Sequence, residues 1–256
     1  MDDVGERIAL GFAHAERQRR ANVEGAEVME IDGLLLAFAS VPDPPVNSVL
    51  VISEPRDPPT ALAAAEDVFR ERDLVFGIDV AVGRHPSVDR AIRSAGYSLL
   101  FSWPAMAVRV DDLPERTLPD GVRVEPVRDA ADASAIAHVE TALADPAELQ
   151  AGSEIADFYA ESSYGVEGAR AFVAWDGDEP VGIASAHVRE GAVGIFGVGV
   201  IPGARRRGIA SALSVIAARA FPADLAWLHA TDMARTVYEQ LGFRGVADWE
   251  VWIRSD

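Results

Sequence analysis

Two stretches far apart in the chain close with the same pattern: helix-forming residues, a glycine, and a strand led by an aromatic residue. Gly96 is followed seven residues later by Trp103, and Gly242 is followed by Trp249 at the same spacing. Glycine commonly follows the last residue of a helix, and an apolar, aromatic run after it favours a strand. Because the pattern recurs at matching places in both halves, the sequence predicts a duplication and two related domains.

The segment 111–120 is polar, contains two prolines and has no hydrophobic periodicity, so it reads as a linker. It separates a predicted N-terminal domain of residues 1–115 from a C-terminal domain of residues 116–256. The first half mixes a strand pattern at 48–53, a helix pattern at 59–72 and a second strand at 74–80. Mixed elements of this kind predict an α+β (mixed α/β) layer fold.

Charge excludes some classes of partner. The 256 residues include 23 basic and 41 acidic side chains, a net charge of −18. A protein that binds nucleic acid or an anionic membrane needs clustered cationic side chains, so neither is an expected partner.

The chain has no cysteine, which excludes disulfides, thiolate nucleophiles and cysteine-ligated zinc. The acidic start and the lack of a long apolar run favour the cytoplasm. We expect no metal site, because four histidines are isolated: His14, His85, His138 and His229.

The segment from Gly194 to Phe243 carries the most chemical information. Residues 195–200 form a strand pattern, 201–204 a turn, and 205–210 the opening of an amphipathic helix. Such a turn presents unpaired backbone N–H groups and the positive end of the helix dipole to one point, which suits a phosphate. The positive charges of Arg205, Arg206 and Arg207 are unfavourable at the positive end of the helix dipole unless an anion is bound there. A solvated basic turn before an ordinary helix is the alternative.

The run Val198-x-Val200-x-Pro202-x-x-Arg205-x-x-Gly208-x-Ala210 resembles the acyl-CoA-binding motif of the GNAT superfamily, the GCN5-related N-acetyltransferases. A hairpin pattern at 171–186, a strand at 225–231 and a closing helix at 234–243 stand in the order expected of that family. The resemblance covers about residues 121 to 256. It implies two GNAT-like modules, each a mostly antiparallel central sheet flanked by helices.

The resemblance also implies a cofactor and a reaction. Acetyl-CoA would be bound by Val198, Gly199, Val200, Arg205, Arg206, Arg207, Gly208, Ile209, Ala210, Ser211 and Thr231. Tyr238 stands where many members keep a tyrosine that protonates the departing thiolate. Its helical offset favours this role over that of a core aromatic. The acceptor would be a primary amine of a small molecule or peptide, attacking directly in a ternary complex. For the oligomeric state, both a monomer and a homodimer are compatible with the sequence.

Two departures from the family pattern matter. Gly194 stands where many members carry a glutamate general base, which leaves His187, Glu190 or bulk solvent to take the proton of the amine. The first half lacks the Arg-x-x-Gly-x-Ala motif and has Ile92 in place of Tyr238, which predicts a degenerate module. A noncatalytic acyl-CoA-binding or regulatory module is therefore the alternative function, and a scaffold that binds no CoA is a further one.

Two charged segments have less specific interpretations. The acid-rich stretches 145–148 and 154–161 would cover the acceptor side in this family, although a solvated helix face is the more ordinary reading. Arg17, Arg19 and Arg20 form a short basic cluster that we expect on a solvated helix.

Overall fold

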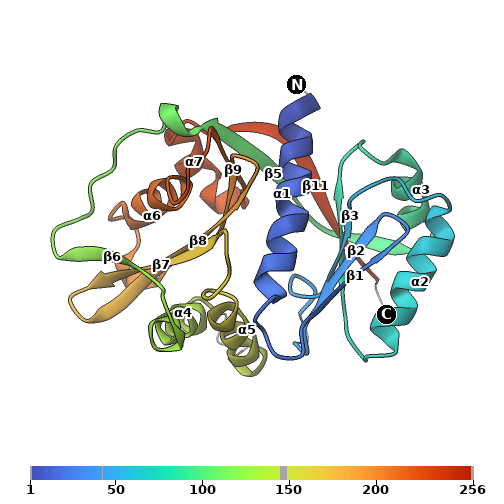
Figure 1. Ribbon diagram of the computed structural model, residues 1–256, viewed down its shortest axis with the longest axis horizontal. Helices are drawn as coiled ribbons and strands as arrows, with labels where there is room; N and C mark the ends of the chain where they lie inside the picture. The colour runs from blue at the N-terminus through green and yellow to red at the C-terminus, as the bar shows by residue number, and fades with distance from the viewer. Residues whose placement is uncertain (1, 42, 145–148, 255–256) are drawn as a thin grey trace. The chain divides into compact units, whose positions relative to one another are not determined.

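The computed structural model describes residues 2–41, 43–144 and 149–254, and the chain divides into two compact units. Unit 1 comprises Met1–Ala105 with Gly245–Asp256, and unit 2 comprises Met106–Arg244 (Figure 1). The helices and strands of the described residues are, in chain order, α1 (Asp2–Arg20), β1 (Glu27–Ile31), β2 (Leu34–Phe38), β3 (Ser48–Val51), α2 (Pro58–Arg70), β4 (Gly77–Ala81), α3 (Pro86–Ser94), β5 (Tyr97–Arg109), η1 (Val110–Asp112), β6 (Val122–Pro126), α4 (Ala130–Leu143), α5 (Leu149–Glu161), β7 (Ala169–Asp176), β8 (Glu179–Arg189), β9 (Ala192–Val200), η3 (Pro202–Ala204), α6 (Ile209–Ala218), β10 (Leu225–His229), α7 (Asp232–Gln240) and β11 (Arg244–Arg254).

Unit 1 is a sheet with helices on both faces. Its strand order is β1-β2-β3-β4-β11-β5, in which β1–β2, β2–β3 and β4–β11 are antiparallel and β3–β4 is parallel. Helices α2 and α3 cover one face and bury a core that includes Phe38, Phe69 and Ile92. Helix α1 packs on β1 and β2.

Unit 2 repeats this plan. Its strand order is β5-β10-β9-β8-β7-β6, in which β9–β8, β8–β7 and β7–β6 are antiparallel and β10–β9 is parallel. Helices α6 and α7 pack on one face around Leu213 and Phe243, and α4 and α5 cover the other around Ile136 and Val139. The predicted mixed α/β class, with a mostly antiparallel sheet flanked by helices, is confirmed.

The closing strands of the two units are exchanged. Strand β5 follows α3 of unit 1, but from Met106 onward it belongs to unit 2 and neighbours β10. Strand β11 follows α7 of unit 2 and pairs with β4 of unit 1, with Trp249 opposite Ala81 and Trp252 opposite Ile78. The compact units therefore differ from the sequence-based division into 1–115 and 116–256. Hydrophobic spacing identifies a strand, but it does not identify the strand with which it pairs.

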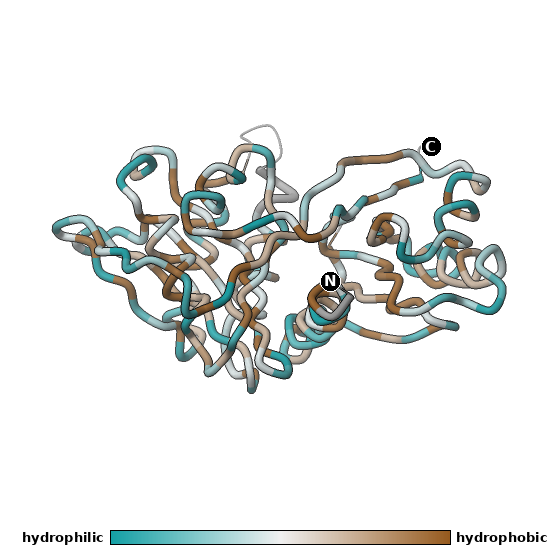
Figure 2. Tube along the Cα trace, turned by 90° about the horizontal axis from the view of Figure 1, so that it is seen from above, coloured by the Kyte–Doolittle hydropathy of each residue, from teal (hydrophilic) through white to brown (hydrophobic). Residues whose placement is uncertain are grey.

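The helix ends that suggested a duplication have the expected geometry. Gly96 and Gly242 follow α3 and α7 with φ of +84° and +95°, a left-handed conformation that glycine adopts without strain. The strands that follow end at Arg109 and Arg254, as the spacing predicts. Figure 2 shows short hydrophobic and hydrophilic stretches alternating along the chain.

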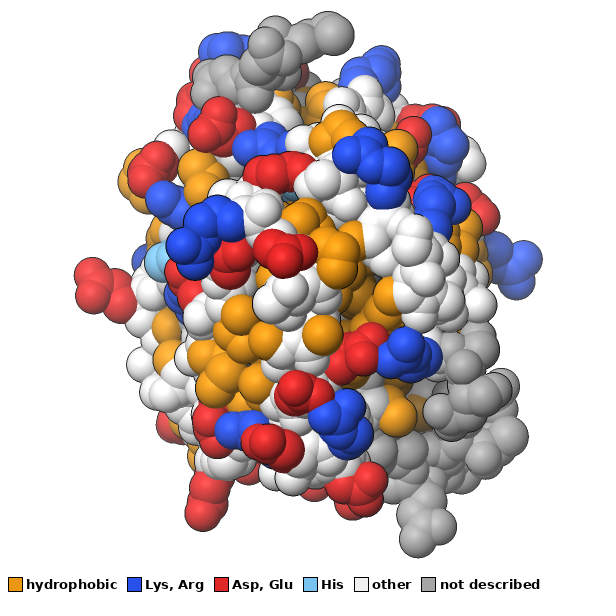
Figure 3. All heavy atoms as spheres, turned by 90° about the vertical axis from the view of Figure 1, so that its right-hand side faces the viewer, with side chains coloured by type: hydrophobic (Ala, Val, Ile, Leu, Met, Phe, Trp, Pro, Cys, Tyr) orange, Lys and Arg blue, Asp and Glu red, His pale blue; other side chains and the backbone are white. Residues whose placement is uncertain are grey.

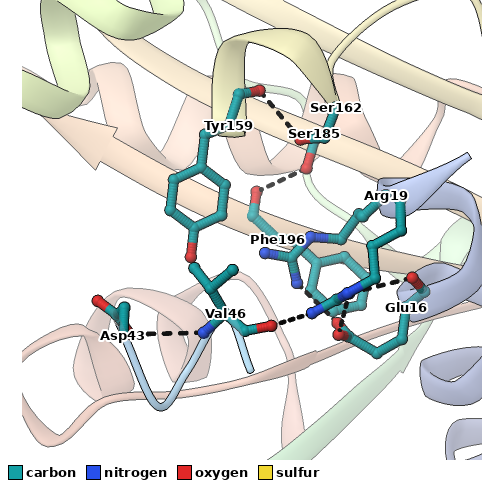
Figure 4. Close-up of polar contacts among 9 residues, drawn as sticks. Glu16, Arg19, Asp43, Val46, Tyr159, Ser162, Ser185 and Phe196 are labelled. Atoms are coloured by element: carbon teal, nitrogen blue, oxygen red, sulfur yellow. Dashed lines mark hydrogen bonds and ion pairs between the residues drawn. The ribbon is translucent and has the colours of Figure 1, made fainter. Parts of the chain in front are cut away.

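The expectation of a solvated basic cluster on α1 is wrong for Arg19 and Arg20, whereas the Arg17 side chain is 38% exposed and pairs with Glu30. The Arg20 side chain is 1% exposed and Glu16 is 2% exposed, and an Arg20 guanidinium nitrogen lies 2.6 Å from a Glu16 carboxylate oxygen. Arg19 lies 2.7 Å from the other oxygen of the same carboxylate (Figure 4). Because the Glu16 carboxylate neutralises the guanidiniums of Arg19 and Arg20 one turn later on the helix, Arg20 is buried and Arg19 is half-buried in unit 1 as ion pairs.

Charge on the surface is mixed in sign. Figure 3 shows acidic and basic side chains interspersed over the α2 and α3 face of unit 1. Across the described residues, no helix is both long and apolar enough to span a bilayer.

Candidate functional site

Strand β9 separates from β10 halfway along its length. The parallel register between them runs from Leu225–Ala192 to Trp227–Gly194, whereas β9 continues to pair with β8 as far as Val200. The predicted residues Val198, Gly199 and Val200 thus lie on a stretch of β9 that has no register partner on the β10 side among the described residues. Unpaired strand backbone of this kind can bind an extended amide-containing chain as an added strand.

A β-bulge accounts for the separation. Ile183 of β8 pairs with Gly199, but Ser185 pairs with Phe196, so β9 has one extra residue between these pairs. Gly197 within the bulge has φ of +58°. The Ser185 hydroxyl donates a hydrogen bond of 3.3 Å to the carbonyl of Phe196 beside the bulge (Figure 4). A bulge bends its strand, and here it turns β9 at the point where pairing with β10 stops.

The turn after β9 leads into α6 without a side-chain cap. Gly208 occupies the N-cap in the left-handed region with φ of +86°, and a Cβ built on it would meet no atom within 4 Å. The first-turn amides of Ile209, Ala210 and Ser211 have no acceptor within the helix. Open space in front of uncapped amides, at the positive end of a helix dipole, fits a phosphate group.

The three arginines before α6 have different surroundings. Arg205 Nε donates to the carbonyl of Val200 at 3.0 Å, and Arg207 forms a 2.5 Å ion pair with Asp176. Arg206 is exposed, has φ of +63°, and forms no ion pair with the residues that the structure describes. Arg205 and Arg207 therefore brace the turn, and Arg206 is the guanidinium most available to an anion.

Tyr238 and Thr231 come from the segment after β10. Thr231 is exposed at the N-cap of α7, without a side-chain cap hydrogen bond. Tyr238 is 7% exposed and packs edge-on to Phe243, with ring centroids 5.8 Å apart. Burial raises the pKa of the Tyr238 phenol to about 12, and a hydrogen bond with Ser214 of α6 opposes that rise. Tyr238 lies deeper in the apolar core than its helical offset suggests, and its phenol is protonated at neutral pH.

Comparison with known proteins agrees with this geometry. Residues 167–245 match the family model of the acetyltransferase (GNAT) domain. Residues 167–245 are therefore similar to a GNAT domain. No curated protein matches the chain significantly.

Solved structures show the same fold over nearly the whole chain. A GCN5-related N-acetyltransferase from Kribbella flavida superposes with a TM-score of 0.73 at 21% identity, covering 97% of this chain and 96% of its own. A tandem GNAT protein from the clavulanic acid biosynthesis pathway gives 0.61 at 13% identity, covering 98% and 94%. A functionally unknown conserved protein from Staphylococcus epidermidis gives 0.68 at 16% identity, covering 91% and 96%.

The position of the missing glutamate in the GNAT domain is filled by aromatic rings. A Cβ on Gly194 would lie 2.6 Å from Trp227 Cζ2 and 2.7 Å from Phe196 Cε2, so even alanine requires both rings to move. His187 pairs with Gly194 across β8 and β9. Glu190 is exposed in the turn between those strands, next to Arg189, at the end of β9 away from the bulge.

His229 is a residue of the GNAT domain that sequence reasoning passed over as isolated. It follows Trp227 by two residues on β10, so both rings lie on one face of the sheet, with centroids 5.7 Å apart. Its position two residues after Trp227 in the predicted strand 225–231, which places both side chains on one face of that strand, is the signal available in the sequence.

Unit 1 has a closed turn where the GNAT domain has an open one. Asp57 caps α2, its carboxylate accepting hydrogen bonds from the backbone and hydroxyl of Thr60, and Pro58 and Pro59 remove two backbone donors. The preceding Glu54 binds His85 Nδ1 at 3.1 Å and also accepts from Ser87, both near the start of α3. A carboxylate and two prolines replace the uncapped amides of α6.

The acidic side chains of α5 point to solvent. Glu154, Asp157 and Glu161 are all exposed, whereas Phe158 is buried beneath them. The segment 145–148 lies outside the described residues. Among the residues that the structure does describe, no group of three or more His, Asp or Glu side chains could hold a metal ion.

Proposed function

We propose that unit 2 transfers an acetyl group from acetyl-CoA to a primary amine by direct attack within a ternary complex. The GNAT fold is the fold of acyltransferases, and the uncapped N-terminus of α6 beside the unpaired edge of β9 is the observation that carries the proposal. The edge supplies main-chain groups to a pantetheine arm, and the first-turn amides with Arg206 supply donors to a pyrophosphate.

The residues divide the chemistry between them. Main-chain donors near the bulge polarise the thioester carbonyl as the amine attacks it. Tyr238 donates a hydrogen bond to the sulfur as the carbon–sulfur bond breaks and negative charge develops. An ordinary thiol has a pKa of about 8.5, whereas burial raises the pKa of the Tyr238 phenol to about 12. The phenol therefore keeps its proton and stabilises the thiolate mainly by donating a hydrogen bond to it. Since the chain has no cysteine, an acyl-cysteine intermediate is excluded.

Unit 1 is proposed to be a degenerate GNAT module without CoA. The Asp57 carboxylate would repel a pyrophosphate from α2, and the Pro58-Pro59 pair lacks the donors that would bind it. Ile92, the counterpart of Tyr238, is fully buried on α3 and carries no proton donor. The structural contribution of the N-terminal half of the sequence is then to supply the β5 residues from Met106 onward to the sheet of unit 2.

A noncatalytic acyl-CoA-binding module is the second candidate. The observation that favours it is Gly194, where the Trp227 and Phe196 rings occupy the place of the usual carboxylate. Such a protein would bind acetyl-CoA through the same turn but would release no CoA.

Calorimetry with acetyl-CoA, followed by thiol release over a panel of amines, distinguishes these functions. For the acetyltransferase we expect one site per chain and turnover with at least one amine. Tyr238→Phe should leave the Kd for acetyl-CoA within about twofold and lower kcat by about 100-fold, a typical effect of losing an acid–base group. Binding without turnover on any amine supports the noncatalytic module, and absence of binding contradicts both.

A further inference from the structure

The general base of this site must differ from the glutamate expected at position 194. Trp227 Cζ2 and Phe196 Cε2 lie less than 3 Å from where a Cβ of residue 194 would be. Real Cβ atoms essentially never approach other atoms so closely, so no side chain fits there unless both rings move. An acceptor amine with a pKa of about 10 is protonated at neutral pH and still has to lose a proton before it can attack.

Two histidines end a row of rings on this face of the sheet. His187, Phe196, Trp227 and His229 follow one another edge to face, with centroid separations of 5.3, 5.4 and 5.7 Å. His187 and Trp227 are the cross-strand neighbours of Gly194 on either side. The row therefore passes over the position of the missing carboxylate and places an imidazole at each end.

Only one end of the row reaches the gap between β9 and β10. His187 is 5% exposed and lies beside the closed, fully paired part of the sheet. His229 is partly exposed as a residue, although its Nε2 atom is buried, so Nδ1 is the ring nitrogen that would accept a proton. It lies two residues beyond the last β10–β9 pair, Trp227–Gly194. The β9 residue equally far beyond that pair is Phe196, at the start of the unpaired edge. His229 thus lies beside the point where β9 and β10 stop pairing, on the strand that leads into α7 and Tyr238.

We propose that His229 is the general base of the acetyl transfer, an inference that rests on the proposed function. The neutral imidazole takes a proton from the ammonium form of the acceptor. The freed amine attacks the thioester carbonyl, a carbon–nitrogen bond forms and the carbon–sulfur bond breaks. The second amine proton passes to the thiolate, which leaves as thiol while Tyr238 donates a hydrogen bond to its sulfur, and the imidazolium returns its proton to solvent. An imidazole can accept and release a proton near neutral pH, which suits this role.

The test compares two classes of acceptor on the full chain at pH 7.5. An alkylamine is mostly protonated at this pH and needs the base, whereas a weakly basic arylamine or hydrazide is already neutral. We expect His229→Gln to lower kcat/KM for the alkylamine by about 100-fold and for the weakly basic acceptor by less than about fivefold. Added imidazole should restore part of the alkylamine activity of His229→Gly.

Three comparisons make the outcome decisive. His138→Gln, an exposed histidine on α4, should behave as wild type, and acetyl-CoA calorimetry on His229→Gln should show an unchanged Kd and hence an intact fold. An equal loss for both acceptors, no loss at all, or an acceptor-dependent loss in His187→Gln instead would overturn the assignment. Failure of wild type to bind acetyl-CoA would refute the proposed function itself, whereas intact binding with wild-type turnover in His229→Gln refutes only the role of His229.

Discussion

Asp79 is a carboxyl group buried in the middle of a sheet. It lies on β4 of unit 1 with 6% of its surface exposed, and burial, with the nearby Glu16 carboxylate, raises its pKa to about 8. For Glu16 burial acts in the same direction, but the guanidiniums of Arg20 and Arg19 outweigh it and hold the pKa of Glu16 below its ordinary value. The cluster is therefore asymmetric, with one carboxylate paired and one carboxyl protonated at neutral pH.

The place of Asp79 in its sheet has a counterpart in unit 2. The last register pair between β3 and β4 is Leu50–Asp79, and the last register pair between β9 and β10 is Gly194–Trp227. Leu50 in unit 1 thus has the register position that Gly194 has in unit 2, and Asp79 has that of Trp227. Helix α1, which carries Glu16 and Arg20, packs on the neighbouring strands.

The raised pKa of Asp79 makes unit 1 less stable as pH rises. Between about pH 4 and pH 8 the folded chain holds a proton at Asp79 that the unfolded chain has lost, so the free energy of unfolding falls with pH across this window. We expect Asp79→Asn to remove that slope and to be more stable than wild type at pH 8.5 by about 1 to 3 kcal/mol.

Urea unfolding at pH 5, 7 and 8.5 measures this difference. Asp120→Asn, an exposed change, should leave the wild-type slope unaltered. Parallel pH dependence of Asp79→Asn and wild type would show that Asp79 is ionised in the folded chain.

At the scale of elements, α2 and α6 start at equivalent places in their units with opposite chemistry. Helix α2 starts with an Asp57 cap, and α6 starts with Gly208 and no cap. The absence of a side chain at Gly208, rather than the number of arginines, leaves room for an anion at α6, because two of the three arginines are engaged within the domain.

Placing an aspartate at Gly208 should convert the start of α6 into that of α2. We expect Gly208→Asp to weaken acetyl-CoA binding by at least about 30-fold, because a carboxylate would occupy the helix N-terminus and repel the pyrophosphate. Gly208→Asn is the matched variant, since both residues must adopt a φ of +86° and differ mainly in charge.

Calorimetry on Gly208→Asp and Gly208→Asn at two salt concentrations separates charge from backbone strain. The difference in affinity for acetyl-CoA between Gly208→Asp and Gly208→Asn should decrease as the salt concentration rises. Equal affinities for acetyl-CoA at low salt would remove the helix N-terminus from the binding site.

The sequence predicts elements better than it predicts their neighbours. Local signals suffice for Gly96 and Gly242 at helix ends and for the glycine turn before α6, because backbone conformation there depends on the residue itself. Burial of Arg20 and the filling of Gly194 by Trp227 depend on residues distant in the chain or on another strand. No local pattern encodes those contacts.

At the scale of the whole molecule, the exchanged strands tie the stability of unit 1 to residues near position 250. Trp252 of β11 is 5% exposed and packs in the core of unit 1 with Ile78 and Phe69. We expect Trp252→Ala to cost about 3 to 5 kcal/mol, and the loss should appear in unit 1.

Hydrogen exchange followed by mass spectrometry locates that loss. In Trp252→Ala, protection of backbone amides from exchange should fall across residues 27–81 and persist across residues 169–200. In Trp227→Ala, protection should fall across residues 169–200 and persist across residues 27–81. A loss confined to residues 116–244 in Trp252→Ala would contradict the exchange of strands.

The same pairing of β11 with β4 sets an order of assembly during translation. Strands β1 to β4 are synthesised early, yet the edge of β4 stays open until residues beyond 245 have left the ribosome, after all of unit 2. Unit 2 receives its β5 residues before the rest of its chain exists, so it can close first. The N-terminal half is therefore synthesised first, but its sheet is completed last. A chain stalled before residue 245 would leave the edge of β4 exposed, where another chain could pair with it.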